Sequence, residues 1–175
     1  MGAHSDQHLQ YCQFDNRQSL LVDKKLFMED LKANYKELVK FEINKNDARF
    51  YIPPYEWYND SISLWSKEAG LTLVNFTPGT RSNADYSVPE MREKYFSSEE
   101  IYKQIMSVES KETLNGHILL FHIGTDPRRT DKFHNRLSAL ITELKNKGYR
   151  FTDLDEASGA IKVTIATSGN KKRKN

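Results

Sequence analysis

The chain is poor in cysteine, in long apolar runs and in net charge, and each shortage excludes a class of protein. Cys12 is the only cysteine among 175 residues, so no internal disulfide forms and the redox compartment stays open. No stretch approaches the roughly 18 apolar residues of a membrane helix, so no membrane insertion is expected. The formal net charge of +2 is too small to indicate a polyanionic partner. A hydrophobic content of 38% is nevertheless sufficient for the core of one globular domain.

The one dense basic run is the segment Lys171 to Lys174 near the C-terminus. Such a run either binds acidic surfaces or, more often, forms a solvated tail. Because no basic aromatic surface accompanies it, a nucleic-acid partner is not expected.

Two histidines four residues apart, His4 and His8, stand near the start of the chain. Imidazoles at this spacing can share one metal ion, on one face of a helix or in a loop that folds around the ion. The helical metalloprotease pattern needs a Glu directly after the first histidine, and Ser5 stands there instead. Cys12 is either a third ligand or a small buried apolar residue. The residues alone leave two interpretations open, a partial metal site and a chance pair of solvated side chains.

Helical and strand patterns alternate along the chain. Four helices are predicted from caps and apolar spacing. The first follows Asp23 and has an apolar stripe from Phe27 to Phe41, and the second follows Asn59 or Asp60. The third begins at the capping box from Ser97 to Glu100, and the fourth follows Thr130. Extended segments are predicted at 49–52, at 71–76 and at 118–121, where the last is apolar enough for a central strand. Ile161, Val163 and Ile165 alternate as in an edge strand. This order predicts an α/β fold with a parallel sheet, either flat or closed into a barrel.

In parallel α/β folds, chemistry collects at the carboxyl ends of the strands. Three such places follow the predicted strands, at 53–56, 77–86 and 122–126, and all are rich in polar or constrained residues. Trp57, Tyr58 and Tyr86 lie in or beside them, and each of these aromatic residues suits either ligand stacking or packing. The three places are therefore the candidate positions for a functional site.

Four motifs, in order along the chain, resemble those of the polysaccharide deacetylase family of carbohydrate esterases. His4-Ser5-Asp6-Gln7-His8 is similar to the family's second motif, His-Ser/Thr-x-x-His. Tyr51-Ile52-Pro53-Pro54-Tyr55 is similar to the third, an aromatic residue followed by Arg-Pro-Pro-Tyr. Asn83-Ala84-Asp85-Tyr86 loosely matches the fourth, which ends in Asp-Trp, and Leu120-Phe121-His122 matches the fifth, Leu-x-His. The resemblance covers roughly residues 2–151.

The resemblance implies a distorted (β/α) barrel that is incomplete because the N-terminal strands are absent. It implies a partial catalytic domain over residues 1–152 and a C-terminal extension over 153–175, an edge strand followed by the basic tail. The family's first motif, Thr-Phe-Asp-Asp, supplies the general base and the third metal ligand and precedes the histidine pair. This motif occurs nowhere in the chain. We therefore interpret the chain as a truncated, inactive portion of the domain and expect self-association through open sheet edges.

The implied activity is metal-dependent removal of acetyl groups from an amino-sugar polysaccharide. His4 and His8 would bind a divalent metal, often zinc in this family, which polarises the acetyl carbonyl and activates water. The Tyr55 backbone N–H would stabilise the oxyanion, and a protonated His122 would donate to the leaving amine. Without the resemblance, the interpretation of His122 is a histidine that forms a hydrogen bond with a backbone carbonyl at the end of a strand. The implied substrate contacts are Pro54, Trp57, Asp85, Tyr86 and Leu120.

Two classes of function follow from these residues. The first is an acetylated-polysaccharide hydrolase, which His4, His8 and His122 favour for the full-length parent. For that parent the resemblance implies an extracytoplasmic location, which is secreted, periplasmic or in the cell envelope. The second is a deacetylase-like module that binds carbohydrate or is structural, without turnover. Ile52, which stands where the third motif has arginine, and the missing aspartates favour this second class.

Overall fold

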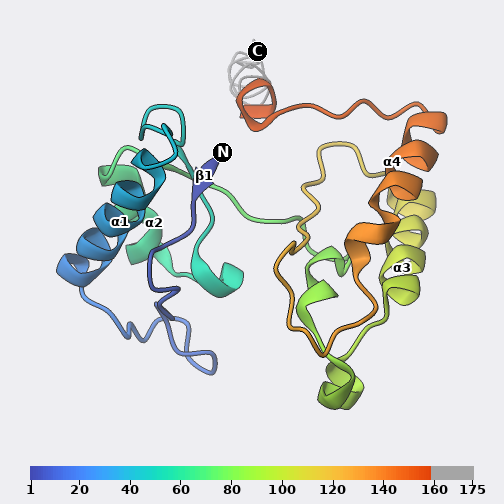
Figure 1. Cartoon of the computed structure of the whole chain (residues 1–175), viewed down its shortest axis with the longest axis horizontal. Coiled ribbons are helices and arrows are strands. Elements are labelled where there is room, and N and C mark those ends of the chain that lie inside the picture. The colour runs from blue at the N-terminus through green and yellow to red at the C-terminus, as the bar shows by residue number, and fades with distance from the viewer. Residues whose placement is uncertain (159–175) are drawn as a thin grey trace, which may run out of the picture. The chain divides into compact units, whose positions relative to one another are not determined.

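The computed structural model describes residues 1–158 and divides the chain after Phe76 into two units, which are described separately (Figure 1). Each unit has its own hydrophobic core. The predicted edge strand at Ile161 to Ile165 and the basic run after it lie outside the described residues, and the predicted boundary at residue 152 stays a prediction. Within the described part of the chain, every helix is too short or too polar to span a membrane.

The first unit contains a three-stranded parallel sheet. Its strands are β1 (Gly2–Ala3), β2 (Phe50–Tyr51) and β3 (Thr72–Leu73), in that spatial order. The parallel order confirms the prediction, although β2 and β3 are shorter than the predicted extended segments. A Cβ on Gly2 would lie 2.5 Å from the carbonyl oxygen of Phe50, so the close approach of these two strands requires glycine at this position. The fold class is thus α/β with a parallel sheet, while closure into a barrel stays a prediction.

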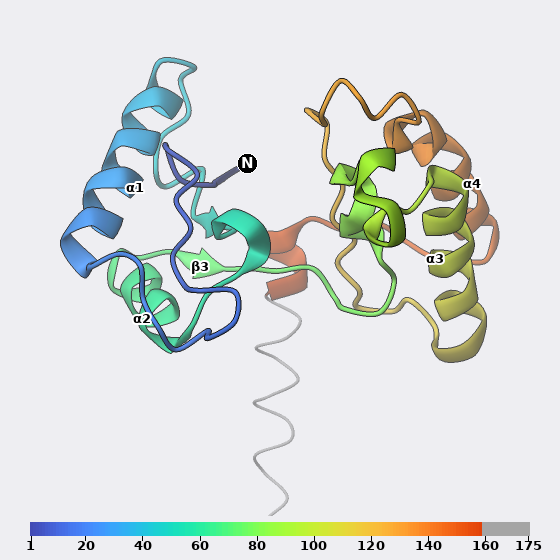
Figure 2. The ribbon, with the colours of Figure 1, turned by 90° about the horizontal axis from the view of Figure 1, so that it is seen from below.

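Two helices complete the first unit, α1 (Lys24–Val39) and α2 (Asp60–Glu68) (Figure 2). Asp23 and Asn59 cap their N-termini through side-chain hydrogen bonds, as predicted. Phe41 was predicted to extend the apolar stripe of α1, but it is 74% exposed because the helix ends two residues earlier. The core combines side chains from the helices, the sheet and the N-terminal segment, among them Tyr11, Phe27, Leu31, Tyr51 and Ile62.

The second unit contains two helices, α3 (Ser98–Glu112) and α4 (Leu137–Asn146), and three short 3-10 segments. These segments are η2 (Ser82–Tyr86), η3 (Pro89–Lys94) and η4 (Phe133–Arg136). The helices lie side by side in both ribbon views, and Tyr102 of α3 donates a hydrogen bond of 2.5 Å to Glu143 of α4 (Figures 1 and 2). The predicted capping box at Ser97 is present. Thr130 does not cap the last helix, because the 3-10 turn η4 precedes α4.

The run 118–121 is not the central strand that its apolar character predicted. Among the described residues it pairs with no strand, and it is only partly buried. Side chains of the segment 77–85 accept from alternate N–H groups instead: Thr77 from Ile118 at 3.0 Å, Ser82 from Leu120 at 3.1 Å, and Asp85 from His122 at 2.7 Å. The N–H groups of Ile118, Leu120 and His122 are therefore satisfied by side-chain acceptors, which hydrophobicity alone does not reveal.

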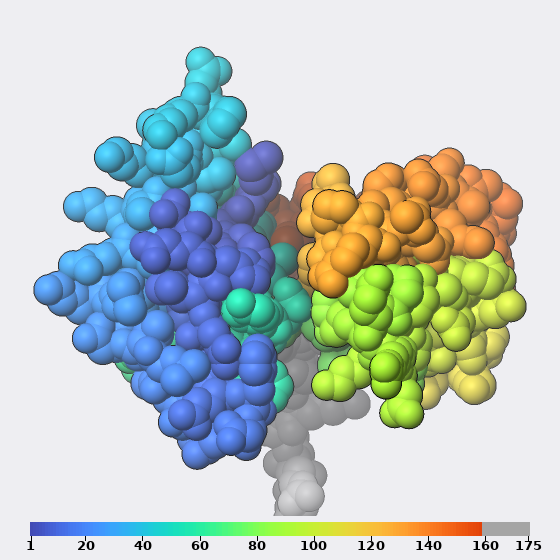
Figure 3. All heavy atoms as spheres, turned by 60° about the horizontal axis from the view of Figure 1, so that its bottom comes forward, coloured from blue at the N-terminus to red at the C-terminus, as the bar shows by residue number. Residues whose placement is uncertain are grey.

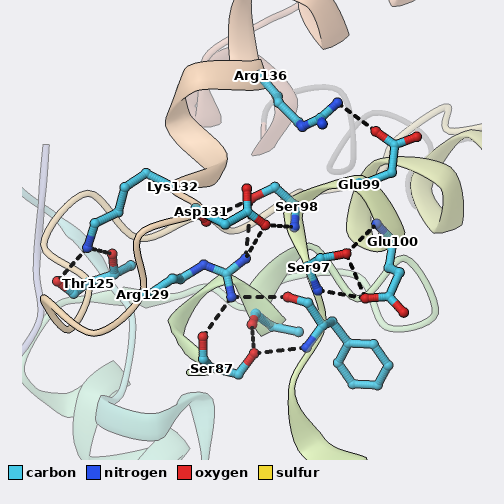
Figure 4. Close-up of polar contacts among 12 residues, drawn as sticks. Ser87, Ser97, Ser98, Glu99, Glu100, Thr125, Arg129, Asp131, Lys132 and Arg136 are labelled. Atoms are coloured by element: carbon cyan, nitrogen blue, oxygen red, sulfur yellow. Dashed lines mark hydrogen bonds and ion pairs between the residues drawn. The ribbon is translucent and has the colours of Figure 1, made fainter. Parts of the chain in front are cut away.

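A fully buried arginine holds the second unit together (Figure 4). Arg129 donates to the carbonyl oxygens of Ser87 at 2.6 Å and Phe96 at 3.0 Å, and to the hydroxyl of Ser98 at 3.3 Å. The Asp131 carboxylate lies 4.0 Å from the guanidinium and also accepts from the Ser98 N–H at the start of α3. One side chain thus joins the loop after η2, the start of α3 and the loop before η4.

Candidate functional site

The two histidines lie together at the surface of the first unit. His4 directly follows β1, and the N-terminal segment that carries both side chains is exposed (dark blue in Figure 3). The two ring centroids are 5.1 Å apart. His4 Nδ1 lies 2.8 Å from the carbonyl oxygen of Ile52, which only accepts, so Nδ1 is the donor. In the neutral ring Nε2 then keeps its lone pair, which is the form that ligates a metal.

A buried carboxylate organises the loop between the histidines. Asp30 of α1, only 2% exposed, accepts from the Ser5 hydroxyl at 2.5 Å, from the Gln7 N–H at 2.9 Å and from the Asp6 N–H at 3.2 Å. Asp30 belongs to none of the sequence motifs. Its place in the sequence could have indicated a buried carboxylate, because Asp30 lies three residues after Phe27, on the face of α1 that packs into the core.

The second and third motifs meet at this point. Pro54 is buried in the short 3-10 turn η1 (Pro54–Glu56) that follows β2, and the ring of Tyr55 lies 4.6 Å from that of His8. Positive φ angles occur in both loops, 73° at Ser5, 53° at His8, 60° at Tyr55 and 52° at Glu56. Each such non-glycine conformation costs about 1–3 kcal/mol and persists only where surrounding contacts impose it. Strain of this kind concentrates at functional sites.

Within the described residues, no group of three or more His, Cys, Asp or Glu side chains is arranged to hold a metal ion. Cys12 is a buried member of the hydrophobic core, and burial raises the pKa of its thiol. The apolar interpretation of Cys12 is therefore confirmed and the ligand interpretation is wrong. His4 and His8 are two imidazole donors of a kind that accepts several divalent metals.

Trp57, predicted to contact substrate, is half-buried against the segment that follows the histidines. Its indole N–H donates to the Gln13 carbonyl at 3.0 Å, and the guanidinium carbon of Arg17 lies 3.9 Å from the ring centroid. Tyr58 lies further from the same guanidinium, with its centroid 5.8 Å away. These contacts are structural, and a substrate role for Trp57 stays a prediction.

The fourth and fifth motifs meet in the second unit. His122 Nδ1 lies 2.6 Å from one carboxylate oxygen of the buried Asp85, and the other oxygen accepts from the His122 backbone N–H. A carboxylate rather than a backbone carbonyl is thus the partner of Nδ1. Because a carboxylate only accepts, Nδ1 keeps its hydrogen and Nε2 is the atom that exchanges a proton. The exposed Tyr86 has its ring 6.0 Å from that of His122, and Leu120 is half-buried.

No family model matches the chain, and no curated protein does. Among solved structures, it matches a wild-type CE4 family pseudoenzyme from Bacillus anthracis at 15% identity and a TM-score of 0.56. A mutant of that pseudoenzyme with restored enzymatic activity matches at 15% identity and a TM-score of 0.57. The matches cover 89% of this chain but only 45% and 46% of the other chains, so this chain spans less than half of their length. At this identity the likeness concerns the fold alone: the chain is similar in fold to part of these CE4 structures, and CE4 is the family of polysaccharide deacetylases that its motifs resemble.

Proposed function

We propose that the chain is a portion of a metal-dependent hydrolase that removes acetyl groups from an amino-sugar polysaccharide. The observation that carries this proposal is the meeting of the His4 and His8 rings with the Tyr55 turn, on a CE4 fold. A His-x-x-x-His loop and a Pro-Pro-Tyr turn come together there although more than 40 residues separate them.

His4 and His8 would hold the metal, a divalent cation such as zinc. The Ile52 carbonyl directs the lone pair of His4 to Nε2, and Asp30 holds the loop between the two rings. When bound, the cation would polarise the acetyl carbonyl and lower the pKa of a bound water. A catalytic zinc site normally has three protein ligands, so two imidazoles are expected to bind the cation weakly.

The remaining roles fall to a backbone amide and to a histidine. The Tyr55 N–H would donate to the oxyanion that forms on the acetyl group. In the second unit, His122 is held by Asp85 through Nδ1, and its Nε2 would donate a proton to the leaving amine. Pro54, Leu120 and Tyr86 are proposed substrate contacts. Asp85 is better placed to orient His122 than to contact substrate, because its carboxylate is buried.

We propose further that this chain alone has negligible turnover. The Thr-Phe-Asp-Asp motif is absent from the sequence, and Ile52 stands where the third motif has an arginine. An alternative is a non-catalytic module that binds acetylated carbohydrate or is structural. The specific observation in its favour is that the wild-type form of the matching structure is itself a pseudoenzyme.

The metal proposal is tested by titrating zinc into the chain and into His4→Ala, His8→Ala and His134→Ala variants, with isothermal calorimetry. We expect weak binding at one ion per chain, lost in the first two variants and kept in the third, because His134 is exposed and belongs to no motif. Zinc binding that survives both His4→Ala and His8→Ala would contradict the assigned ligands.

The activity proposal is tested by measuring acetate release from N-acetylated chito-oligosaccharides. We expect no release above buffer. Robust release that His122→Ala abolishes would show that the chain is a complete catalyst. Binding of the oligosaccharide without zinc dependence and without release would instead support the non-catalytic module.

A further inference from the structure

The segment after His8 folds back as a hairpin over residues 11–21. Its closing contacts are the Leu21 N–H to the Tyr11 carbonyl at 2.8 Å, the Gln13 N–H to the Ser19 carbonyl at 3.0 Å, and the bridge between Cys12 and Leu20. Tyr11 and Cys12 are buried in the core, so the base of the hairpin is anchored while its tip reaches the surface.

Side chains from the segment after the Pro-Pro-Tyr turn hold the tip of the hairpin. The guanidinium of Arg17 lies over the ring of Trp57 in a cation–π contact, and the indole N–H of Trp57 donates to the Gln13 carbonyl. The Asn59 side chain donates to the Arg17 carbonyl at 3.2 Å. These contacts bind the tip on both sides of Phe14. The position of Phe14 is therefore fixed before any ligand arrives, which lowers the entropy lost on binding.

Phe14 is 59% exposed on this fixed tip, and it extends a row of rings that starts at the histidines. Its ring centroid lies 5.7 Å from that of Tyr55, with the two planes at 86°. Tyr55, itself 47% exposed, lies in turn 4.6 Å from His8. Two large rings thus stand at a right angle beside the histidine pair, and each remains substantially open to solvent.

We infer that Phe14 and Tyr55 form a sugar-binding platform next to His8, which makes Phe14 a substrate-binding residue. This inference rests on the proposed function and names the contact that places the carbohydrate at that site. A pyranose ring carries C–H groups on its faces, and these pack on the electron-rich face of an aromatic ring. Phe14 suits this role better than Trp57, because Arg17 covers a face of the indole and the Gln13 carbonyl takes its N–H.

The inference is tested by measuring how fully N-acetylated chitotetraose binds to the whole chain and to four variants. We expect Phe14→Ala to weaken binding about 2- to 12-fold, the range of a single aromatic contact. Phe14→Tyr should bind like the original chain. Phe41→Ala is the matched control, since it removes a phenylalanine that is also exposed in the same unit, at 74%, and should leave binding unchanged. Trp57→Phe keeps a ring but loses the bond to Gln13, so we expect a smaller loss than for Phe14→Ala.

The outcomes separate this inference from the proposed function. If the original chain binds chitotetraose and Phe14→Ala binds it equally well, the platform is wrong and the proposed function stands. An equal loss in Phe14→Ala and Phe41→Ala would also overturn the platform. If the original chain binds no acetylated chito-oligosaccharide, the proposed function fails and the platform fails with it. Circular dichroism checks that the variants keep their fold, as the exposure of Phe14 leads us to expect.

Discussion

The Asp30 carboxylate accepts a 2.5 Å hydrogen bond from the Ser5 hydroxyl, and through it helix α1 holds the loop between the two histidines. Two backbone N–H groups of the same loop bond to this carboxylate as well. The side chain is buried, so losing these acceptors would leave donors without partners inside the protein. Positive φ angles at Ser5 and His8 are the conformations that this anchor helps to impose.

Asp30→Asn should therefore destabilise the first unit and loosen the histidine pair. An amide offers a single acceptor oxygen to three donors, so we expect a loss of about 1–3 kcal/mol in the free energy of unfolding, together with weaker zinc binding. Urea denaturation and calorimetric zinc titration measure the two effects. Glu29→Gln, which removes an exposed carboxylate from the neighbouring position, is the control and should change neither. Unchanged stability and zinc affinity in Asp30→Asn would refute the assignment.

Asp85→Asn should change the tautomer of His122. The carboxylate bonded to Nδ1 holds the hydrogen on that nitrogen, whereas an amide can offer either an acceptor or a donor. We expect nitrogen NMR of the neutral ring to show hydrogen on Nδ1 in the original chain and a mixture of tautomers in the variant. Asp126→Asn, in the loop after His122, should leave the ring unaffected. Hydrogen on Nε2 in the neutral ring of the original chain would contradict the assigned hydrogen bond from Nδ1 to Asp85.

Arg129→Lys should destabilise the second unit strongly. The guanidinium donates to three oxygen atoms in the interior, and a single ammonium nitrogen cannot reproduce that fork. We expect the free energy of unfolding to fall by about 3 kcal/mol, the scale of losing charged hydrogen bonds. Its neighbour gives a matched control: Arg128 is exposed and pairs with Asp126, so Arg128→Lys should leave the free energy of unfolding nearly unchanged. Similar losses in the two variants, measured by urea denaturation, would contradict the role of Arg129.

Tyr102 should make the stability of the second unit sensitive to alkaline pH. The hydrogen bond to Glu143 raises the pKa of Tyr102 to about 12, above its ordinary value of 10.0. The folded state then holds this proton more tightly than the unfolded state, so its contribution is complete below pH 10 and is lost as pH rises toward 12. Urea midpoints should fall more steeply over this interval in the original chain than in Tyr102→Phe. Tyr86→Phe, at an exposed position, should follow the original chain, and parallel curves for all three would reject the coupling.

Three of the four helix starts were predictable because a cap is a contact between residues two or three positions apart, whereas the predicted cap Thr130 does not cap α4. Asp23, Asn59 and Ser97 each cap the helix that the sequence predicted. The prediction of a strand at 118–121 was wrong because apolar character shows that a segment avoids water but not what pairs with its backbone. The partners are the side chains of Thr77, Ser82 and Asp85, and no local sequence pattern indicates these long-range hydrogen bonds.

The sequence by itself determined the order of the motifs, the two imidazoles four residues apart and the parallel α/β character of the fold. Only the tertiary structure decided what lies against each functional side chain. Asp30 is 25 residues from Ser5, the Ile52 carbonyl is 48 from His4, and Asp85 is 37 from His122. Contacts across such separations depend on how packed elements bring distant residues together, so they leave no periodicity in the sequence. The same holds for Phe14, whose place beside Tyr55 is set by the Trp57 contacts that fix the hairpin.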